Sequence, residues 1–145
     1  MKRRFESSRA EETLEFGREI GRELTAPALI LLDGDLGAGK TLLVRGIVEG
    51  LGISDSSEVR SPTFSLVNRH RTPCGTVYHV DLYRLDTLRQ QDSIGLQEIL
   101  ADETAFVLIE WGDQLLLPHE GALRIRIRRD DRRGRRSIRV DGGKV

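Results

Sequence analysis

Apolar residues recur along the chain with two different periods, and the period predicts which segments are helices and which are strands. Apolar side chains at helical spacing predict helices over residues 8–24, 40–51 and 94–100. Ser8 and Glu11 have the S-x-x-E spacing of a capping box, so we expect the first helix to begin there.

Strands are predicted by short apolar runs, by strict alternation and by turn residues. The runs at 28–32 and 105–109 are unbroken and predict strands that are buried on both faces. Because helices and strands interleave, the sequence predicts an α/β fold in one domain, residues 1–145, with a mixed parallel and antiparallel sheet flanked by helices. The remaining strands are expected at 64–70, 76–82, 123–128 and 137–140.

Composition excludes several classes of protein. Hydrophobic residues make up 38% and charged residues 32%, as in a globular domain. No apolar run approaches the roughly 20 residues that a membrane-spanning helix needs, and no secretory signal is visible. The single cysteine, Cys74, excludes an internal disulfide. We therefore expect a cytoplasmic protein with no membrane partner.

The formal net charge is zero, but the charges are unevenly distributed. Residues 123–145 hold ten basic and three acidic side chains, and the rest of the chain is acidic. A basic end indicates contact with phosphate, nucleic acid or an acidic partner, although a solvated surface strand explains it equally well. We expect residues 123–145 to form a basic hairpin and residues 1–7 to be flexible.

One segment carries a complete phosphate-binding signature. Residues 34–41 read GDLGAGKT and match G-x-x-x-x-G-K-[ST] at every fixed position. Glycines let backbone N–H groups converge on phosphate oxygens, and the following helix adds positive charge at its N-terminus. Lys40 is expected to reach the β- and γ-phosphates and Thr41 to bind Mg²⁺. The absence of a guanine-recognition sequence, Asn/Thr-Lys-x-Asp, favours ATP over GTP.

Acidic residues near strand ends are candidates for holding the metal and the attacking water. Glu110 follows the buried run 105–109, as the acid of a Walker B element follows its strand. In another strand, alternation places His79, Asp81 and Tyr83 on one face. The structural alternatives are that Glu110 is a helix-cap or loop acid and that the other three side chains lie on a solvent-exposed edge. The sequence does not separate the roles of Asp81 and Glu110.

Taken together, the motifs resemble the TsaE (YjeE) family of small bacterial P-loop ATPases, which are required for threonylcarbamoyladenosine formation in tRNA. The resemblance covers about residues 8–140. The segments that carry it are GDLGAGKT at 34–41 with Arg45-Gly46, SPTF at 61–64, YHVDLYRL at 78–85 and IEW at 109–111.

The resemblance implies a role for each site residue. Lys40, Asp81 and Glu110 are the expected catalytic residues; Thr41 and Glu110 hold magnesium, and Asp81 positions the water or supports the metal shell. Residues 9–11 are expected near the base. The expected nucleotide-binding residues are Asp35, Leu36, Gly37, Ala38, Gly39, Lys40, Thr41, Leu42 and, from the C-terminal hairpin, Arg136 or its neighbour Arg135.

The resemblance also implies an Mg-ATP hydrolase, slow alone, whose cycle resets a transferase complex of TsaB and TsaD proteins. Contact with tRNA is then expected to be indirect, and no DNA partner is expected. A small-molecule P-loop kinase is the alternative, because many such kinases are of similar size. Residues 132–136 then correspond to an arginine-bearing lid, but no acceptor-binding signature is evident. A nucleotide-gated binding module and a direct nucleic-acid binder are further interpretations.

Overall fold

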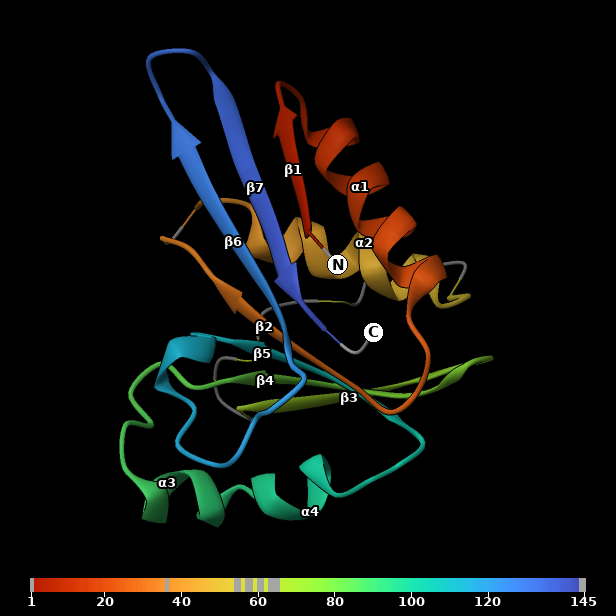
Figure 1. The fold of residues 1–145 in the computed structure, drawn as a ribbon, viewed down its shortest axis with the longest axis vertical. Helices are drawn as coiled ribbons and strands as arrows, with labels where there is room; N and C mark the ends of the chain where they lie inside the picture. The colour runs from red at the N-terminus through yellow and green to blue at the C-terminus, as the bar shows by residue number, and fades with distance from the viewer. Residues whose placement is uncertain are drawn as a thin grey trace.

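The fold is built on one seven-stranded sheet in the computed structural model, which describes residues 2–35, 37–53, 56, 59, 62 and 66–143. In chain order the elements are β1 (Lys2–Ser7), α1 (Ala10–Glu23), β2 (Ala28–Asp33), α2 (Lys40–Gly50), β3 (Val67–Thr72), β4 (Gly75–Asp81), α3 (Leu88–Ser93), α4 (Leu96–Leu100), β5 (Ala105–Glu110), the short 3₁₀ turn η1 (Gly112–Gln114), β6 (Leu123–Asp130) and β7 (Arg135–Gly142). The strand order is β1-β7-β6-β2-β5-β4-β3 (Figure 1). Strands β6, β2, β5 and β4 run parallel, and β3, β7 and β1 run antiparallel to their neighbours. The predicted α/β fold with a mixed sheet is confirmed.

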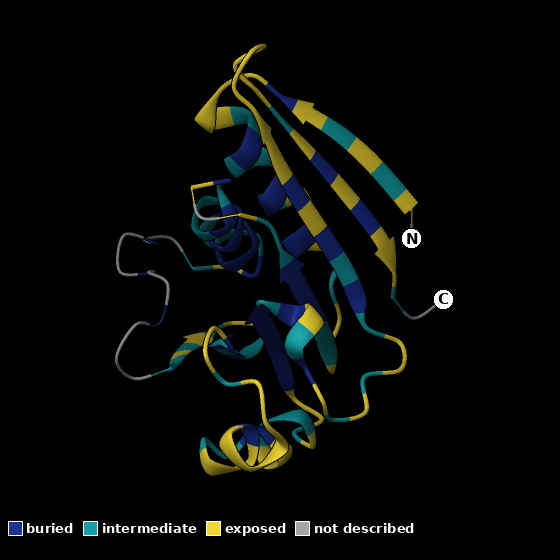
Figure 2. Ribbon diagram, turned by 90° about the vertical axis from the view of Figure 1, so that its left-hand side faces the viewer, coloured by how far each residue is buried: buried dark blue, intermediate teal, exposed yellow. Residues whose placement is uncertain are grey.

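The central strands are covered on both faces. Ile30 and Leu32 of β2 pack in the cluster formed with α1 and α2, whereas Leu31 packs in the cluster that contains Leu96 of α4. Every residue of β5 is buried, which explains the unbroken apolar run at 105–109. Strands β6, β7 and β1 are covered on one face only, so more buried residues alternate with exposed ones along them: buried with exposed in the middle of β6 and β7, and half-buried with exposed in β1 (Figure 2).

Residues 2–7 form a strand instead of the flexible segment expected from the sequence. β1 pairs antiparallel with β7, and Phe5 stacks on Phe16 of α1 with ring centroids 4.6 Å apart. Ser7 Oγ, which is buried, is hydrogen-bonded to Thr13 Oγ1 at 2.7 Å. The pairing partner lies at the other end of the sequence, so local composition could not reveal the strand.

Several element boundaries differ from the sequence prediction. The prediction of a capping box between Ser8 and Glu11 is wrong. Helix α1 has Arg9 as its N-cap, and Ser8 Oγ donates a hydrogen bond to Glu12 Oε1 at 2.6 Å. Helix α3 was not predicted, although Thr87 and Gln90 form a capping box at its start. Strand β3 begins at Val67, and residues 64 and 65 of the predicted strand lie outside the described part.

None of the described helices combines the length and the apolar character that crossing a membrane requires.

Helices α1 and α2 touch along their backbones through four glycines, which we call the glycine contact: Gly17 and Gly21 on α1, Gly46 and Gly50 on α2. A Cβ atom at Gly17 would lie 2.6 Å from the carbonyl oxygen of Leu43, and one at Gly46 would overlap the carbonyl oxygen of Leu14. These neighbours are backbone atoms that cannot rotate away. The contact therefore requires glycine on both helices.

The first prediction concerns the glycine contact. Gly46→Ala gains about 1 kcal/mol of helix propensity, but the added methyl forces the two backbones apart. We expect a net loss of roughly 2 kcal/mol in the free energy of unfolding, measured by urea denaturation. Glu19→Ala, at an exposed position of α1, is the control and should stay within about 0.5 kcal/mol of wild type. Equal stability of both variants would show that the helices separate without cost.

Candidate functional site

The glycine-rich loop lies between β2, a central parallel strand, and the first residue of α2. Gly37 and Gly39 have φ of 78° and 110°, which other residues rarely adopt, and Gly39 is the N-cap of α2. Asp35 O accepts a hydrogen bond from Ala38 N at 3.0 Å, and Leu36 lies outside the described part. The N–H groups at the start of α2 and the helix dipole make this end of the helix suitable for an anion.

Lys40 is the first residue of α2, and its side chain is buried against an aromatic ring. Its Nζ lies 4.4 Å from the centroid of the Trp111 ring. Within the described part of the chain, this ammonium has no hydrogen-bond partner although it is fully covered. A buried charged donor without an acceptor is costly, so the site fits an anion that supplies oxygen acceptors.

Trp111 reaches Lys40 because the chain turns sharply after β5. Trp111 has φ 60°, the left-handed conformation that costs a non-glycine residue energy. The next residue, Gly112, packs so closely on β2 that a Cβ atom would lie 2.5 Å from Leu31 Cβ. Asp33 Oδ1 accepts a hydrogen bond from Asp113 N at 3.1 Å and fixes the turn to the end of β2. Neither Asp33 nor Gly112 belongs to a motif, so the sequence alone did not indicate these two residues.

Glu110 is held by a buried histidine. Its Oε2 lies 2.6 Å from His79 Nε2, and the exposed fractions of the two side chains are 4% and 0%. His79 belongs to β4, which is an inner strand, so the solvated edge considered for this residue is wrong. The imidazole therefore orients the carboxylate that ends β5.

Asp81 lies directly opposite Glu110 in the β4–β5 register. Its Oδ1 accepts a hydrogen bond from Tyr83 N at 2.8 Å. Burial raises the pKa of Asp81, the charge of Glu110 raises this pKa further, and the charge of Lys40 lowers it. Lys40, Asp81 and Glu110, the three residues expected to be catalytic, therefore lie together where strands β4 and β5 end.

Two arginines of the β6–β7 hairpin approach the loop from the other side. A Cβ atom at Gly39 would lie 3.1 Å from Arg136 Nε, and one at Gly37 would lie 3.9 Å from Arg129 Nη1. Arg136 and Arg129 are paired across the hairpin, and Arg136 Nε is buried with no hydrogen-bond partner among the described residues. Arg135, the alternative, forms an ion pair with Glu6 instead. Arg129 was not expected from the sequence.

The remaining predicted residues are placed as follows. Thr41 and Leu42 lie half-buried in the first turn of α2, and Ala38 is buried. Residues 9–11 follow β1, whose Ser7 is paired with Arg136, so they lie at the same end of the sheet as the hairpin arginines. Of the segment 61–64, only Pro62 is described, and it is buried.

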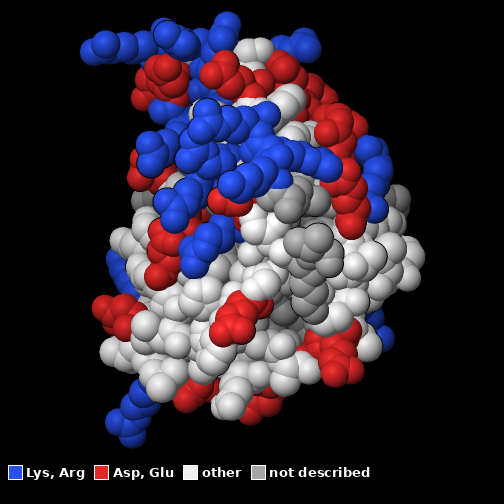
Figure 3. Space-filling view, in the orientation of Figure 1, with Lys and Arg blue, Asp and Glu red and all other residues white. Residues whose placement is uncertain are grey.

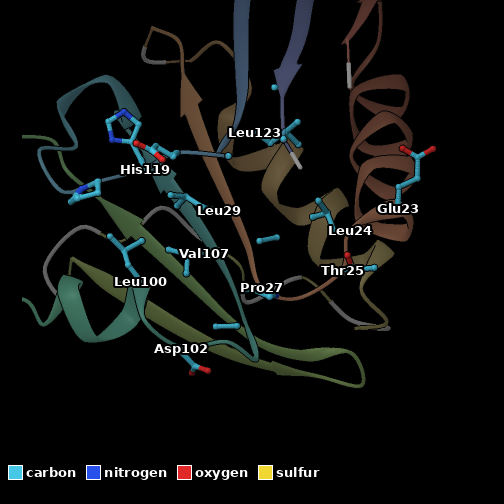
Figure 4. Close-up of a pocket in the computed structure, with 17 residues that line it drawn as sticks. Glu23, Leu24, Thr25, Pro27, Leu29, Leu100, Asp102, Val107, His119 and Leu123 are labelled. Atoms are coloured by element: carbon cyan, nitrogen blue, oxygen red, sulfur yellow. The ribbon is translucent and has the colours of Figure 1, made fainter. Parts of the chain in front are cut away.

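A cavity of about 280 Å³ opens at the opposite edge of the sheet, where β2 and β5 begin (Figure 4). Its walls combine apolar and polar residues, and its charged residues include Glu23, Asp102 and Glu120. Carboxylates repel phosphate, and Lys40 does not line this cavity. The chemistry of the glycine-rich loop therefore lies elsewhere.

The described arrangement defines a class of protein. A central parallel strand that leads through a glycine-rich loop into a helix, with an acid at the end of the neighbouring strand, is the arrangement of P-loop proteins. Within this class, the family model for the threonylcarbamoyl adenosine biosynthesis protein TsaE matches residues 7–138, and the chain belongs to this family. The resemblance inferred from the motifs is confirmed. The family is involved in tRNA threonylcarbamoyladenosine biosynthesis.

Individual relatives agree with this assignment. The chain is 39% identical over 109 residues to the tRNA threonylcarbamoyladenosine biosynthesis protein TsaE of Treponema pallidum, covering 75% of this chain and 78% of the relative. For the proteins of the same name from Nostoc and Synechocystis, identities are 42% and 50%, with 72% and 52% of this chain covered. The aligned part spans only 65% and 47% of those two relatives. The crystal structure of Bacillus subtilis YdiB matches with a TM-score of 0.79 and 27% identity over 99% of this chain and 87% of that one.

The second prediction concerns Asp81 and pH. Because its pKa is raised in the folded protein, the folded state favours the neutral carboxyl; the stability that this group contributes is complete at low pH and lost as pH rises through the folded pKa. Asp81→Asn keeps an acceptor for Tyr83 N and removes the charge. Without nucleotide, we expect this variant to unfold at a higher temperature than wild type at neutral pH, and at the same temperature below about pH 3, where the unfolded carboxyl is also protonated.

Asp92→Asn, at an exposed position of α3, is the control and should match wild type at both pH values. A lower unfolding temperature of Asp81→Asn at neutral pH would contradict the assignment of burial as the dominant effect on this carboxyl.

Proposed function

We propose that the chain binds and hydrolyses ATP with Mg²⁺, and that this cycle supports a transferase complex of TsaB- and TsaD-type proteins in forming threonylcarbamoyladenosine in tRNA. The observation that carries the proposal is the buried Lys40 ammonium, which has no acceptor among the described residues. A triphosphate oxygen supplies the acceptor that burial demands. The cytoplasm is the proposed location.

The site supports hydrolysis by charge neutralisation and placement, without a covalent intermediate. The N–H groups of the loop and the start of α2 bind phosphate oxygens, and Lys40 neutralises negative charge on them. Arg136 and Arg129 approach the same loop from the hairpin and stabilise the charge that develops in the transition state. These interactions would be strongest as the γ-phosphate separates.

The oxygen-bearing side chains fit magnesium, which is usually held by one or two carboxylates together with waters and substrate phosphates. Among the described residues, no group of three or more His, Cys, Asp or Glu forms a metal site, so a metal that shares the nucleotide's phosphates fits best. Thr41 and Glu110 are the proposed ligands. When bound, magnesium neutralises phosphate charge. Asp81 is the proposed residue that orients the attacking water and accepts its proton. The opposite assignment, with Asp81 holding the metal and Glu110 orienting the water, is the alternative.

The third prediction tests how His79 positions Glu110. His79→Ala removes the 2.6 Å contact that orients the Glu110 carboxylate, so we expect turnover to fall about 10- to 100-fold. His79→Gln can offer a side-chain donor to Glu110 and should recover part of the loss. The readout is kcat for phosphate release over a range of Mg²⁺ concentrations. If both variants lose the same activity, the imidazole has only a packing role.

The fourth prediction tests the proposed reaction itself. Phosphate release from Mg-ATP is measured with the purified chain, with and without TsaB and TsaD proteins. We expect slow release by the chain alone and stimulation by the partners. Lys40→Ala should reduce the rate by about 100-fold or more, because it removes a preorganised charge from the phosphates.

Each other outcome of this experiment would contradict a different part of the proposal. Equal rates with and without partners would exclude activation by the complex. Phosphate transferred to a metabolite would identify a kinase. Nucleotide binding without turnover under both conditions would identify a nucleotide-gated binding module.

A further inference from the structure

One face of the three-stranded region β1–β7–β6 carries charge across its whole width. We call the side of these strands away from α1 and α2 the outer face. Phe5, Ile127 and Ile138 point to the covered side, and the residues that alternate with them form the outer face. Apart from Ser137, every position of the outer face is charged, with seven cations and three carboxylates. Figure 3 shows Lys and Arg gathered over the half of the molecule where Figure 1 places these strands.

Three arginines form a row across the outer face. Arg126 of β6 is paired in register with Arg139 of β7, which is paired in turn with Arg4 of β1. We call these residues the arginine row. Like charges directly opposite each other on neighbouring strands destabilise a sheet. Among the described residues, Arg4 and Arg139 have no ion pair, whereas Arg126 forms one with Asp113 at 3.6 Å and also interacts electrostatically with Asp33. The repulsion between Arg4 and Arg139 is therefore a cost that a bound anion would relieve.

The surface beside the arginine row is hollowed. A shallow depression of about 250 Å³ is lined by Lys2, Arg3, Arg4, Arg139, Val140 and the carboxylate Asp141. The outer face lies on the far side of the sheet from the glycine-rich loop, because Arg129 and Arg136, which approach the loop, alternate with the outer residues. The outer face and the glycine-rich loop are therefore separate sites.

The composition of the outer face indicates what it binds. The centre of a protein–protein interface is depleted in charged residues and enriched in aromatic ones, but the outer face has no apolar side chain. Interfaces with nucleic acids are polar and strongly positive. Arginine is suited to them because its planar guanidinium binds phosphate through two hydrogen bonds. With strands 4.7–4.9 Å apart, the row spans about 10 Å, which is longer than the distance between neighbouring phosphates of one strand.

We propose that the outer face binds the phosphate backbone of RNA, with the arginine row at its centre. The choice of tRNA as this RNA rests on the proposed function. This proposal differs from the indirect contact with tRNA that the family resemblance implies. The affinity depends on charge and falls with salt, because binding to phosphates releases counterions.

The fifth prediction tests this inference with a row variant, Arg4→Ser/Arg126→Ser/Arg139→Ser. Binding of the full chain to unmodified tRNA is measured by fluorescence anisotropy between about 50 and 200 mM salt. We expect the row variant to bind at least about 30-fold more weakly at the lowest salt. Its plot of log affinity against log salt should be shallower by about three units, one for each phosphate that an arginine no longer neutralises. Its thermal unfolding temperature should equal or exceed that of wild type, because repulsion has been removed.

A control variant, Arg69→Ser/Arg71→Ser/Arg89→Ser, removes the same charge from exposed positions on β3 and α3. It should bind tRNA almost as wild type does. Equal losses in the two variants, or wild-type tRNA binding by the row variant, would overturn the inference. If the row variant keeps tRNA affinity but loses binding to TsaB or TsaD, the outer face binds an acidic protein, which also overturns it.

ATP turnover is measured on the same samples and separates this inference from the proposed function. We expect the row variant to hydrolyse ATP as wild type does. A wild-type chain that hydrolyses ATP without binding tRNA contradicts only the RNA site. A chain that binds tRNA through the arginine row without hydrolysing ATP contradicts only the proposed reaction.

Discussion

The glycine contact between α1 and α2 determines how the rest of the structure is arranged. It sets the distance between the helix that begins at the glycine-rich loop and the helix that carries β1 against the sheet. Since β1 is paired with β7, and β7 carries Arg136, the position of this arginine over Gly39 depends indirectly on four residues that have no side chain. A backbone contact of this kind tolerates no adjustment by rotamers, so the hairpin and the loop are held in fixed relation.

The sequence was sufficient to predict those parts of the fold that depend on local pattern. The buried runs at 28–32 and 105–109 became β2 and β5 because strands covered on both faces have no polar positions. β1 and the glycine contact could not be predicted, since each depends on a partner far along the chain. The capping box at Ser8 failed for a local reason: Glu12, one residue later, accepts its hydrogen bond.

The candidate site also contains some residues that the sequence predicts and others that only the three-dimensional structure identifies. Lys40 and Glu110 belong to contiguous motifs, and the parallel register of β2 with β5 brings their ends to one edge. The role of His79 in orienting Glu110 appears only when β4 is known to be an inner strand. The strained backbone at Trp111 depends on the packing of Gly112 against Leu31. Such packing leaves no periodic signal in a sequence.

The pairing of β1 with β7 also determines the order in which the molecule can be completed during synthesis. Glu6 and Arg135 are in contact although 129 positions separate them. At a translation rate of about 5–20 residues per second, roughly 6–26 s therefore pass between the synthesis of β1 and that of its partner strand. Until then, β1 and the outer edge of β6 lack the strand that pairs with both of them, and the glycine-rich loop lacks Arg136. A nascent chain can thus form the loop and α2 early, but the site gains its full positive charge only when the last strand has left the ribosome.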